Sequence, residues 1–465
     1  MEDTLLIKVW ERLSPVELKS FEKFIRSPFF NQREDVTRLY DWLVKNEKKQ
    51  GLQKEAAFAF AYPGQDFHDQ NFRLLLSYFF RLVEQFLSLQ HILPDKLLLK
   101  QHLAEAYQAH GLTDNALRVV RQSRQILEKD TFENVARLEW QYNLRFHEFK
   151  FDTEQHLLNA ADLQALSDDL DLIYLSKKLR QICMLLNNKA VYKTHFEIGF
   201  LNEIINYIEQ KELIAHPSVG VYYFAYLTLS GHREEQHFRQ FKKSLFEKAG
   251  SFPPEELHEL HLLAINYCVR KLNEGNQLFF PEVLELYKEG LRTGTLLDNG
   301  LLSRFTYYNI VVAAIKTGDF SWAEDFIYSY KNSLEKRYRE SIFSFNLARL
   351  EYSRKNYDTA MKLLQKANYR DVLFSLATKT LALKIYYELD EFDLLQSHLE
   401  AMKKFISRKH VIGYHRDNYL NIVRYTQKLT GLNYYSKKSV SDLRQQIENE
   451  EILTEKEWLL SQLGF

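Results

Sequence analysis

The sequence predicts an all-α protein built as a stacked array of helix pairs. Only 8 Pro and 15 Gly interrupt its 465 residues, too few for a chain of many short strands and turns. Long amphipathic stretches, with apolar residues three or four positions apart, fill most of the chain, as expected of helices that bury one face. Toward the C-terminal end a helix-turn-helix pattern recurs at a regular spacing, and repetition on this scale indicates stacked helices.

Composition and charge limit the possible classes of function. The chain has 62 Lys and Arg against 62 Asp and Glu, and 45% of its residues are hydrophobic, which excludes a globally basic nucleic-acid binder and a disordered tail protein. The N-terminus lacks the basic and apolar stretches of a signal peptide, and no apolar run is long enough to span a bilayer. We therefore expect a cytoplasmic protein without membrane insertion, in which Cys183 and Cys268 are reduced and buried.

Residues 1–92 are predicted to form a separate helical module. The run Ser14-Pro15-Val16-Glu17 combines a capping serine, a proline at the first helical position and a glutamate at the third, which together mark the start of a helix. Asn31 and Glu34 are expected to cap the next helix in the same way. Two further helices follow, and the second of them is expected over about 69–89.

Part of this module is similar to a known DNA-binding fold. The pattern from Leu39 through Lys54-Glu55-Ala56 to Asn71-Phe72-Arg73 resembles the helical part of winged-helix domains that precede helical repeats in some bacterial transcription activators. However, no hairpin that could be the wing follows Leu87, and residues 66–87 carry three acidic residues against two arginines. A helical cap that covers the first repeat and binds protein is the preferred interpretation, with DNA contact as the alternative.

Residues 97–432 read as successive helix pairs. In the clearest unit, small or apolar residues stand where two antiparallel helices must touch, at Leu347-Ala348, Tyr357, Ala360, Leu364 and Ala367. The equivalents of Ala360 are Ala323 and Leu395, at spacings of 37 and 35 residues. This unit resembles the tetratricopeptide repeat, whose period is 34 residues. The resemblance implies a right-handed α-solenoid of tetratricopeptide-like helix pairs.

Residues 433–465 are expected to form capping helices that seal the last repeat. The run Thr454-Glu455-Lys456-Glu457 has the pattern of a capping box, in which the threonine and the second glutamate satisfy free amides at the start of a helix. Trp458, Leu459 and Leu463 would give this short helix an apolar face. A terminal repeat needs such a cover over its exposed side.

No catalytic, cofactor-binding or metal-binding pattern is complete in the sequence. The run His258-Glu259-Leu260-His261 looks like half of a zinc-protease motif, but that motif needs histidines four positions apart to meet one metal. Neither a phosphate-binding glycine loop nor a nucleophile elbow is present. We therefore expect a protein that is not an enzyme and that holds no cofactor and no metal.

The tetratricopeptide resemblance implies that the first helix of each pair lines a concave groove. The register of the repeats assigns seven residues to this predicted groove, namely Tyr308, Phe345, Arg349, Tyr352, Lys384, Tyr387 and Arg424. Arg349, Lys384 and Arg424 would form a row of cations beside an aromatic strip, which suits a peptide with acidic and apolar side chains. The alternative is that these cations pair with helix neighbours such as Glu388, or only lay their aliphatic stems over the core.

These observations favour a scaffold or adaptor that binds a protein or peptide partner in the groove, and they do not favour nucleic acid as the partner. The alternative is a transcriptional or signalling regulator. In that case residues 1–92 would contact DNA while the helical array senses a ligand or a partner.

Overall fold

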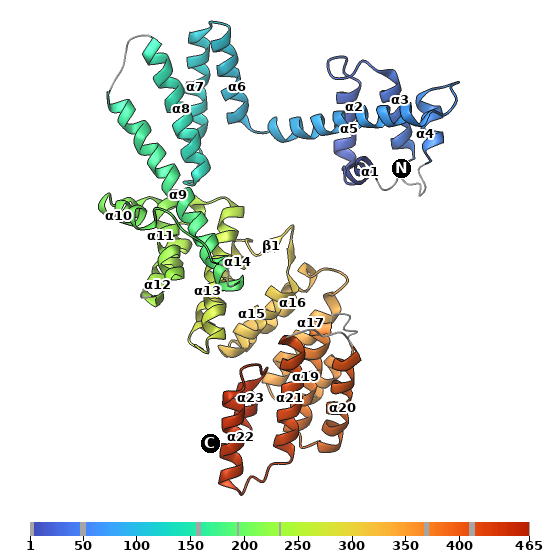
Figure 1. Ribbon diagram of the computed structural model, residues 1–465, viewed down its shortest axis with the longest axis vertical. Coiled ribbons are helices and arrows are strands. Elements are labelled where there is room, and N and C mark those ends of the chain that lie inside the picture. The colour runs from blue at the N-terminus through green and yellow to red at the C-terminus, as the bar shows by residue number, and fades with distance from the viewer. Residues whose placement is uncertain are drawn as a thin grey trace. The chain divides into compact units, whose positions relative to one another are not determined.

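The computed structural model describes seven ranges of the chain: residues 4–46, 53–154, 160–192, 195–231, 234–366, 372–408 and 414–464. Within these ranges the protein forms 23 α-helices and a single short hairpin, so the predicted all-α class is confirmed (Figure 1). The hairpin pairs β1 (Leu297–Asp298) with β2 (Leu301–Leu302) in antiparallel register. None of the helices in these ranges combines the length and the hydropathy needed to cross a membrane.

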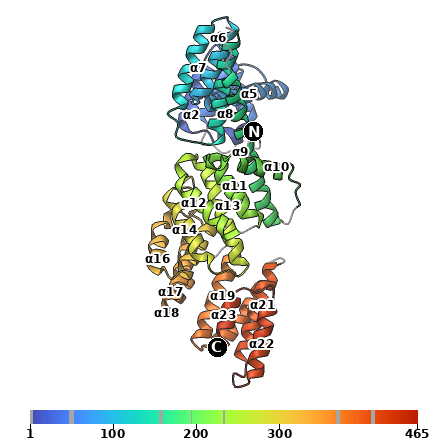
Figure 2. The ribbon, with the colours of Figure 1, turned by 90° about the vertical axis from the view of Figure 1, so that its left-hand side faces the viewer.

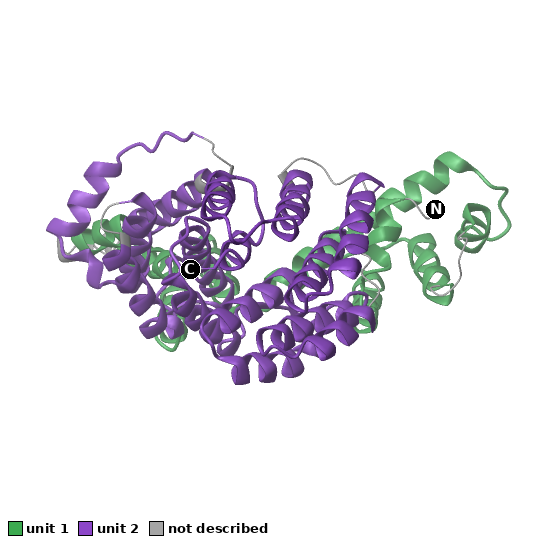
Figure 3. Cartoon of the chain, turned by 90° about the horizontal axis from the view of Figure 1, so that it is seen from below, with its two compact units in different colours: residues 1–131, 136–173 green, residues 132–135, 174–465 purple. Residues whose placement is uncertain are grey.

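The chain divides into two compact units (Figure 3). Unit 1 comprises residues 1–131 and 136–173, and unit 2 comprises residues 132–135 and 174–465. The division falls inside the region 97–432 that the sequence predicts to be repeats. Each unit is described separately below.

Unit 1 contains the first eight helices and the start of the ninth. They are α1 (Leu5–Trp10), α2 (Pro15–Ile25), α3 (Glu34–Lys45), α4 (Lys54–Ala61), α5 (Asp69–Ile92), α6 (Lys96–Ala109), α7 (Thr113–Leu127), α8 (Val135–Glu154) and α9 (Ala160–Tyr192). Helices α1 to α5 enclose an aromatic core in which the ring of Phe21 contacts those of Trp10, Tyr40 and Phe79. No strand occurs in the described part of residues 1–92, so the wing of a winged-helix domain is not formed there.

Of the two helix caps predicted in this module, one is confirmed and the other is wrong. The capping box at Ser14 is confirmed: the Ser14 hydroxyl accepts the Glu17 amide at 3.3 Å, and the Glu17 carboxylate accepts the Ser14 amide at 2.7 Å. The cap predicted at Asn31 is wrong, because α3 begins at Glu34 without a side-chain cap. The Asn31 amide is buried instead and donates to the carbonyl of Ile25 at 2.9 Å, since the turn between α2 and α3 leaves that carbonyl in need of a donor.

Unit 2 contains the remaining helices. They are α10 (Leu201–Gln210), α11 (Pro217–Ser230), α12 (Glu234–Glu247), α13 (Pro254–Asn273), α14 (Phe279–Arg292), α15 (Arg304–Lys316), α16 (Phe320–Ser329), α17 (Arg339–Ser353), α18 (Tyr357–Lys366), α19 (Val372–Glu388), α20 (Phe392–Arg408), α21 (Tyr414–Thr430), α22 (Lys437–Asn449) and α23 (Lys456–Ser461). Short 3-10 turns lie at Leu213–Ala215, Ala249–Ser251 and Lys331–Ser333. Cys183 and Cys268 are free and buried, as predicted.

The turn inside each of three successive helix pairs has the same geometry. The second residue after the first helix is left-handed at Gly318 (φ 76°), Lys355 (φ 64°) and Asp390 (φ 58°), and these positions repeat at 37 and 35 residues. The next amide in each turn bonds back five residues, as Asn356 does to the Glu351 carbonyl at 2.9 Å. This arrangement satisfies free carbonyls at the helix end and reverses the chain direction, so α15–α16, α17–α18 and α19–α20 are equivalent hairpins.

The small residues predicted at the contact inside a pair lie there. Ala348 of α17 and Ala360 of α18 are fully buried, and these two helices pack against each other. The equivalents of Ala360, Ala323 in α16 and Leu395 in α20, are also fully buried. Ala367, the last of the residues quoted for this unit, lies outside the described ranges.

Replacing Ala360 with tryptophan should therefore force α17 and α18 apart. We expect a loss of about 1 to 3 kcal/mol from overpacking, confined to the helices that stack on this pair. Hydrogen exchange measured peptide by peptide would check it, through faster exchange in α15 to α20 and unchanged exchange in α1 to α5. A change of exchange rate that is equal in all helices would contradict the close contact at Ala360.

Candidate partner-binding cavity

A cavity of about 570 Å³ lies in unit 2, walled by the first helices of successive pairs. Its sides come from α15, α17, α19 and α21, and the segment 454–461, which contains α23, covers it. Helices α19, α21, α22 and α23 lie side by side in both views (Figure 1 and Figure 2). The walls of the cavity therefore include α15, α17 and α19, the helices that carry most of the residues predicted for a groove.

Five of the seven residues predicted for the groove line this cavity. They are Tyr308, Phe345, Arg349, Tyr352 and Lys384. In α17, the three predicted residues that line the cavity are spaced four and three positions apart, so they share one face of the helix. The repeat spacing then places the equivalent faces of α15 and α19 beside them.

The other two predicted residues do not line the cavity. Tyr387 lines a neighbouring cavity of about 470 Å³ and bonds the Tyr434 hydroxyl at 2.7 Å. Arg424 forms an ion pair with Glu450 at 2.5 Å. Helix α21 presents Tyr419 to the cavity instead. Arg424 is five positions further along this helix, so its side chain points roughly 140° away from that of Tyr419. The predicted register of α21 is therefore displaced.

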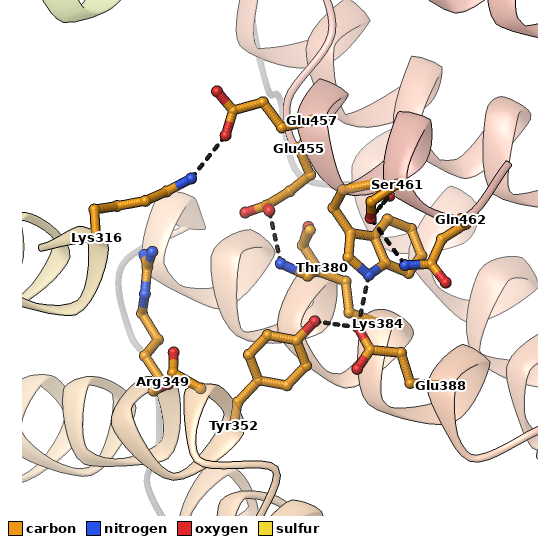
Figure 4. Close-up of polar contacts among 12 residues, drawn as sticks. Lys316, Arg349, Tyr352, Thr380, Lys384, Glu388, Glu455, Glu457, Ser461 and Gln462 are labelled. Carbon is orange, nitrogen blue, oxygen red and sulfur yellow. Dashed lines mark hydrogen bonds and ion pairs between the residues drawn. The ribbon is translucent and has the colours of Figure 1, made fainter. Parts of the chain in front are cut away.

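Arg349 and Lys456 are the cations of the cavity that form no ion pair within the described residues, and Lys456 donates to backbone carbonyls. The Arg349 guanidinium lies 4.7 Å from the centre of the Tyr308 ring, which itself stacks on Phe345 at 6.0 Å. Arg349 forms no ion pair with any residue in the described part of the chain; its polar partner is the Tyr308 side chain, and Figure 4 shows no bond from its guanidinium to Lys316 or Glu455. Burial acts to lower the pKa of Arg349, but Tyr308 and Glu455 raise it above its ordinary value, so the group stays charged.

The lysines of the cavity are held by carboxylates of the C-terminal segment (Figure 4). The buried Lys384 ammonium lies 2.7 Å from the Glu455 carboxylate and 4.7 Å from the centre of the Tyr352 ring. Lys316 pairs with Glu457 at 2.7 Å. Burial acts to raise the pKa of Glu455, but Lys384 and Arg349 lower it below its ordinary value, so this carboxylate remains ionised at neutral pH.

Glu388, at the end of α19, connects the cavity to its neighbour and to α23. Its carboxylate accepts hydrogen bonds from the Trp458 indole at 2.8 Å, from the Tyr357 hydroxyl at 2.5 Å and from the Tyr352 hydroxyl. Lys355 pairs with it at 3.1 Å. Burial acts to raise the pKa of Glu388, but these donors together lower it below its ordinary value. Donors from α17, α18 and α23 thus meet on one carboxylate.

The C-terminal helix is not capped in the way the sequence predicts. Helix α23 begins at Lys456, and Glu455 precedes it in the left-handed region at φ 55° without a side-chain cap. The predicted capping box at Thr454 is therefore wrong, because the Glu455 and Glu457 carboxylates bond the lysines of the cavity instead of the helix amides. Trp458, Leu459 and Leu463 are buried in one core with α19 to α22.

The two histidines of the partial zinc motif form hydrogen bonds with neighbouring protein groups. His258 bonds the Thr295 carbonyl, and the buried His261 bonds the Leu257 carbonyl at 3.0 Å and the Thr295 hydroxyl at 3.3 Å, so both rings bond groups of the protein itself. Among the residues that the structure describes, no three His, Cys, Asp or Glu side chains are grouped as a metal site would require.

The comparisons with known proteins found no family model, no curated protein and no solved structure that matches this chain. The cavity is therefore interpreted from its own geometry.

Several lining residues were not predicted from the sequence as groove residues; they include Lys316, Tyr419, Trp458, Glu455 and Glu457. A signal for the last one is present, because five glutamates stand within residues 448–457 of a chain with no net charge. An acidic run of this kind suits a row of cations elsewhere in the same chain.

Replacing Glu388 with glutamine should destabilise the C-terminal helices at neutral pH. The donors now share the two oxygens of the Glu388 carboxylate, whereas the glutamine amide has only one acceptor oxygen. We expect the free energy of unfolding to fall by about 1 to 3 kcal/mol. Because the folded pKa of Glu388 lies below its ordinary value, its contribution is present above that value and is lost as the pH falls through the folded pKa. The deficit of the variant in urea unfolding should thus shrink in acid. A deficit that stays constant with pH would contradict this role.

Proposed function

We propose that this protein is a non-enzymatic interaction scaffold, and that its cavity binds a segment of a protein partner carrying acidic and apolar side chains. The observation that carries the proposal is Arg349, a charged guanidinium in an aromatic cavity that lacks an ion pair within the described residues. A half-buried cation of this kind gains from an anionic partner group, because charge-assisted hydrogen bonds are stronger than neutral ones.

The remaining charges of the cavity support the choice of Arg349 as the anchor. Four cations and two carboxylates are among its lining residues. Lys316 and Lys384 are paired with the two carboxylates, and Lys456 donates to the backbone carbonyls of Glu448 and Glu450. An acidic group of a partner would therefore bind Arg349 in preference to the other cations of the cavity.

The aromatic lining supports a protein partner. Tyrosine, tryptophan and arginine are the side chains that contribute most to binding energy at protein interfaces, and Tyr308, Tyr352, Trp458 and Arg349 all line this cavity. Its volume of about 570 Å³ is within the range of sites that hold one compact group. The cavity suits an anchor of one or two side chains from a longer partner segment.

The repeated hairpins support a scaffold as the architecture of this site. The turns at Gly318, Lys355 and Asp390 share one geometry, and the spacing of the pairs they join is close to the 34 residues of tetratricopeptide repeats. We infer that α15 to α20 belong to a tetratricopeptide-like array. In such arrays neighbouring repeats present one continuous surface, which is commonly used to bind extended segments.

Reversing the charge of Arg349 tests this function. The partner is first identified by purification of the tagged chain from its native cells, and its affinity is then measured by calorimetry with purified components. Arg349→Glu should weaken binding by about 2 to 5 kcal/mol, because an acidic group of the partner would then meet a like charge inside the cavity.

The matched control is Lys362→Glu, which makes the same change of charge at an exposed position on α18, away from the cavity. It should leave the affinity unchanged. Unaltered binding by Arg349→Glu, together with lost binding by Lys362→Glu, would place the partner on the other side of the helix pairs.

A further inference from the structure

The chain already contains one segment with the chemistry proposed for the partner. Residues 448–463 carry five glutamates and then the run Trp458-Leu459-Leu460. This acidic and then apolar segment ends over the cavity, so the cavity holds side chains of the kind it is proposed to bind.

The contacts of α23 divide between two faces. Leu459 and Leu463 are buried in the core with α19 to α22, as in an ordinary terminal helix. The other face contacts the cavity through polar groups: Glu455 pairs with Lys384 and Glu457 with Lys316, both at 2.7 Å. The indole of Trp458 donates to Glu388 at 2.8 Å. A helix that only covers the last repeat needs its apolar face and does not need the polar contacts.

The backbone at the start of α23 has an unfavourable conformation that allows these polar contacts. Glu455 has φ 55°, a left-handed conformation that is unfavourable for a residue with a side chain. In this conformation its carboxylate meets Lys384, and no side-chain cap forms at the helix start. The segment thus gives up local helix stability while it directs its carboxylates into the cavity.

We propose that residues 455–461 act as an internal ligand of the cavity, and that the partner carries a segment of the same chemistry that competes with them. This inference rests on the proposed function. The partner segment has carboxylates to replace Glu455 and Glu457 on the two lysines, and an aromatic residue three positions after the first carboxylate to replace Trp458 on Glu388. A further acidic group of the partner reaches Arg349, which the internal ligand leaves without an ion pair.

Competition of this kind sets the affinity of the cavity for its partner. A segment joined to the same chain acts at an effective concentration of the order of millimolar, so it excludes weak ligands without any added contact. The apparent dissociation constant of a partner then equals its intrinsic value divided by the fraction of chains in which the cavity is free. Weakening the internal ligand should therefore tighten the binding of the partner, whereas weakening a purely structural cap would not.

Variants that change only the internal ligand test this proposal. The probe is a fluorescent synthetic peptide with the sequence of residues 448–463, and its anisotropy is followed as full-length chain is added. Glu455→Gln combined with Glu457→Gln in the chain should bind this peptide at least tenfold more tightly than the unchanged chain, because Lys384 and Lys316 lose their internal partners. A peptide with lysine at all five glutamate positions should not bind.

The matched control is Glu451→Gln, which removes one charge from the same segment at an exposed position outside the cavity. It should leave the affinity for the peptide unchanged. Equal affinity of the double variant and the unchanged chain would overturn the proposal, as would weaker binding by the double variant. A dimeric mass of the unchanged chain in light scattering, abolished by the double variant, would also overturn it, because the segment would then belong to a second copy.

The failure of this inference can be told apart from failure of the proposed function. If partner binding depends on Arg349 but does not respond to the double variant, the partner binds with α23 in place and only the internal ligand is refuted. If neither the peptide nor the partner responds to Arg349→Glu, the cavity is not the binding site and both proposals are refuted.

Discussion

The ion pair between Lys384 and Glu455 joins the C-terminal segment to the cavity of unit 2, and the binding proposed for this cavity depends on it. The two residues are 71 positions apart, and their contact fixes the C-terminal segment over helices α15 to α21. Removing one partner of a buried ion pair leaves an uncompensated charge, so the pair acts as a constraint even where its net contribution to stability is small. While it is intact, Arg349 is the cation that remains for an outside anion.

The same face of the helix pairs therefore has two uses that conflict. A terminal repeat is stable only when its apolar side is covered, and Leu459 and Leu463 provide part of that cover. The polar face of α23 adds contacts with Lys384, Lys316 and Glu388 that coverage does not require. A partner that displaces α23 must bury an equivalent apolar surface, which explains why the proposed partner segment needs apolar as well as acidic residues.

Local periodicity was sufficient to predict part of the cavity from the sequence. Phe345, Arg349 and Tyr352 share a face of α17 because helical spacing alone determines it, and the repeat length then carries that face to Tyr308 and Lys384. The capping box at Ser14 is also local and was predicted correctly. Arg424 was misplaced because the register of the earlier repeats was extended to α21. Asn421 of this helix bonds the Ile452 carbonyl, which belongs to the C-terminal segment and not to a repeat.

The pairing of the C-terminal segment with the cavity could not be derived from local pattern. Thr454 and Glu457 have the spacing of a capping box, and only the lysines of distant helices give the Glu455 and Glu457 carboxylates a stronger alternative. Hydrogen exchange of α23 in the full-length chain, with and without a saturating amount of the 448–463 peptide, tests the central claim most directly. Competition predicts that the amides of α23 in the chain exchange faster when the peptide is bound, while those of α17 exchange more slowly. Unchanged or slower exchange in α23 at saturation would contradict the account.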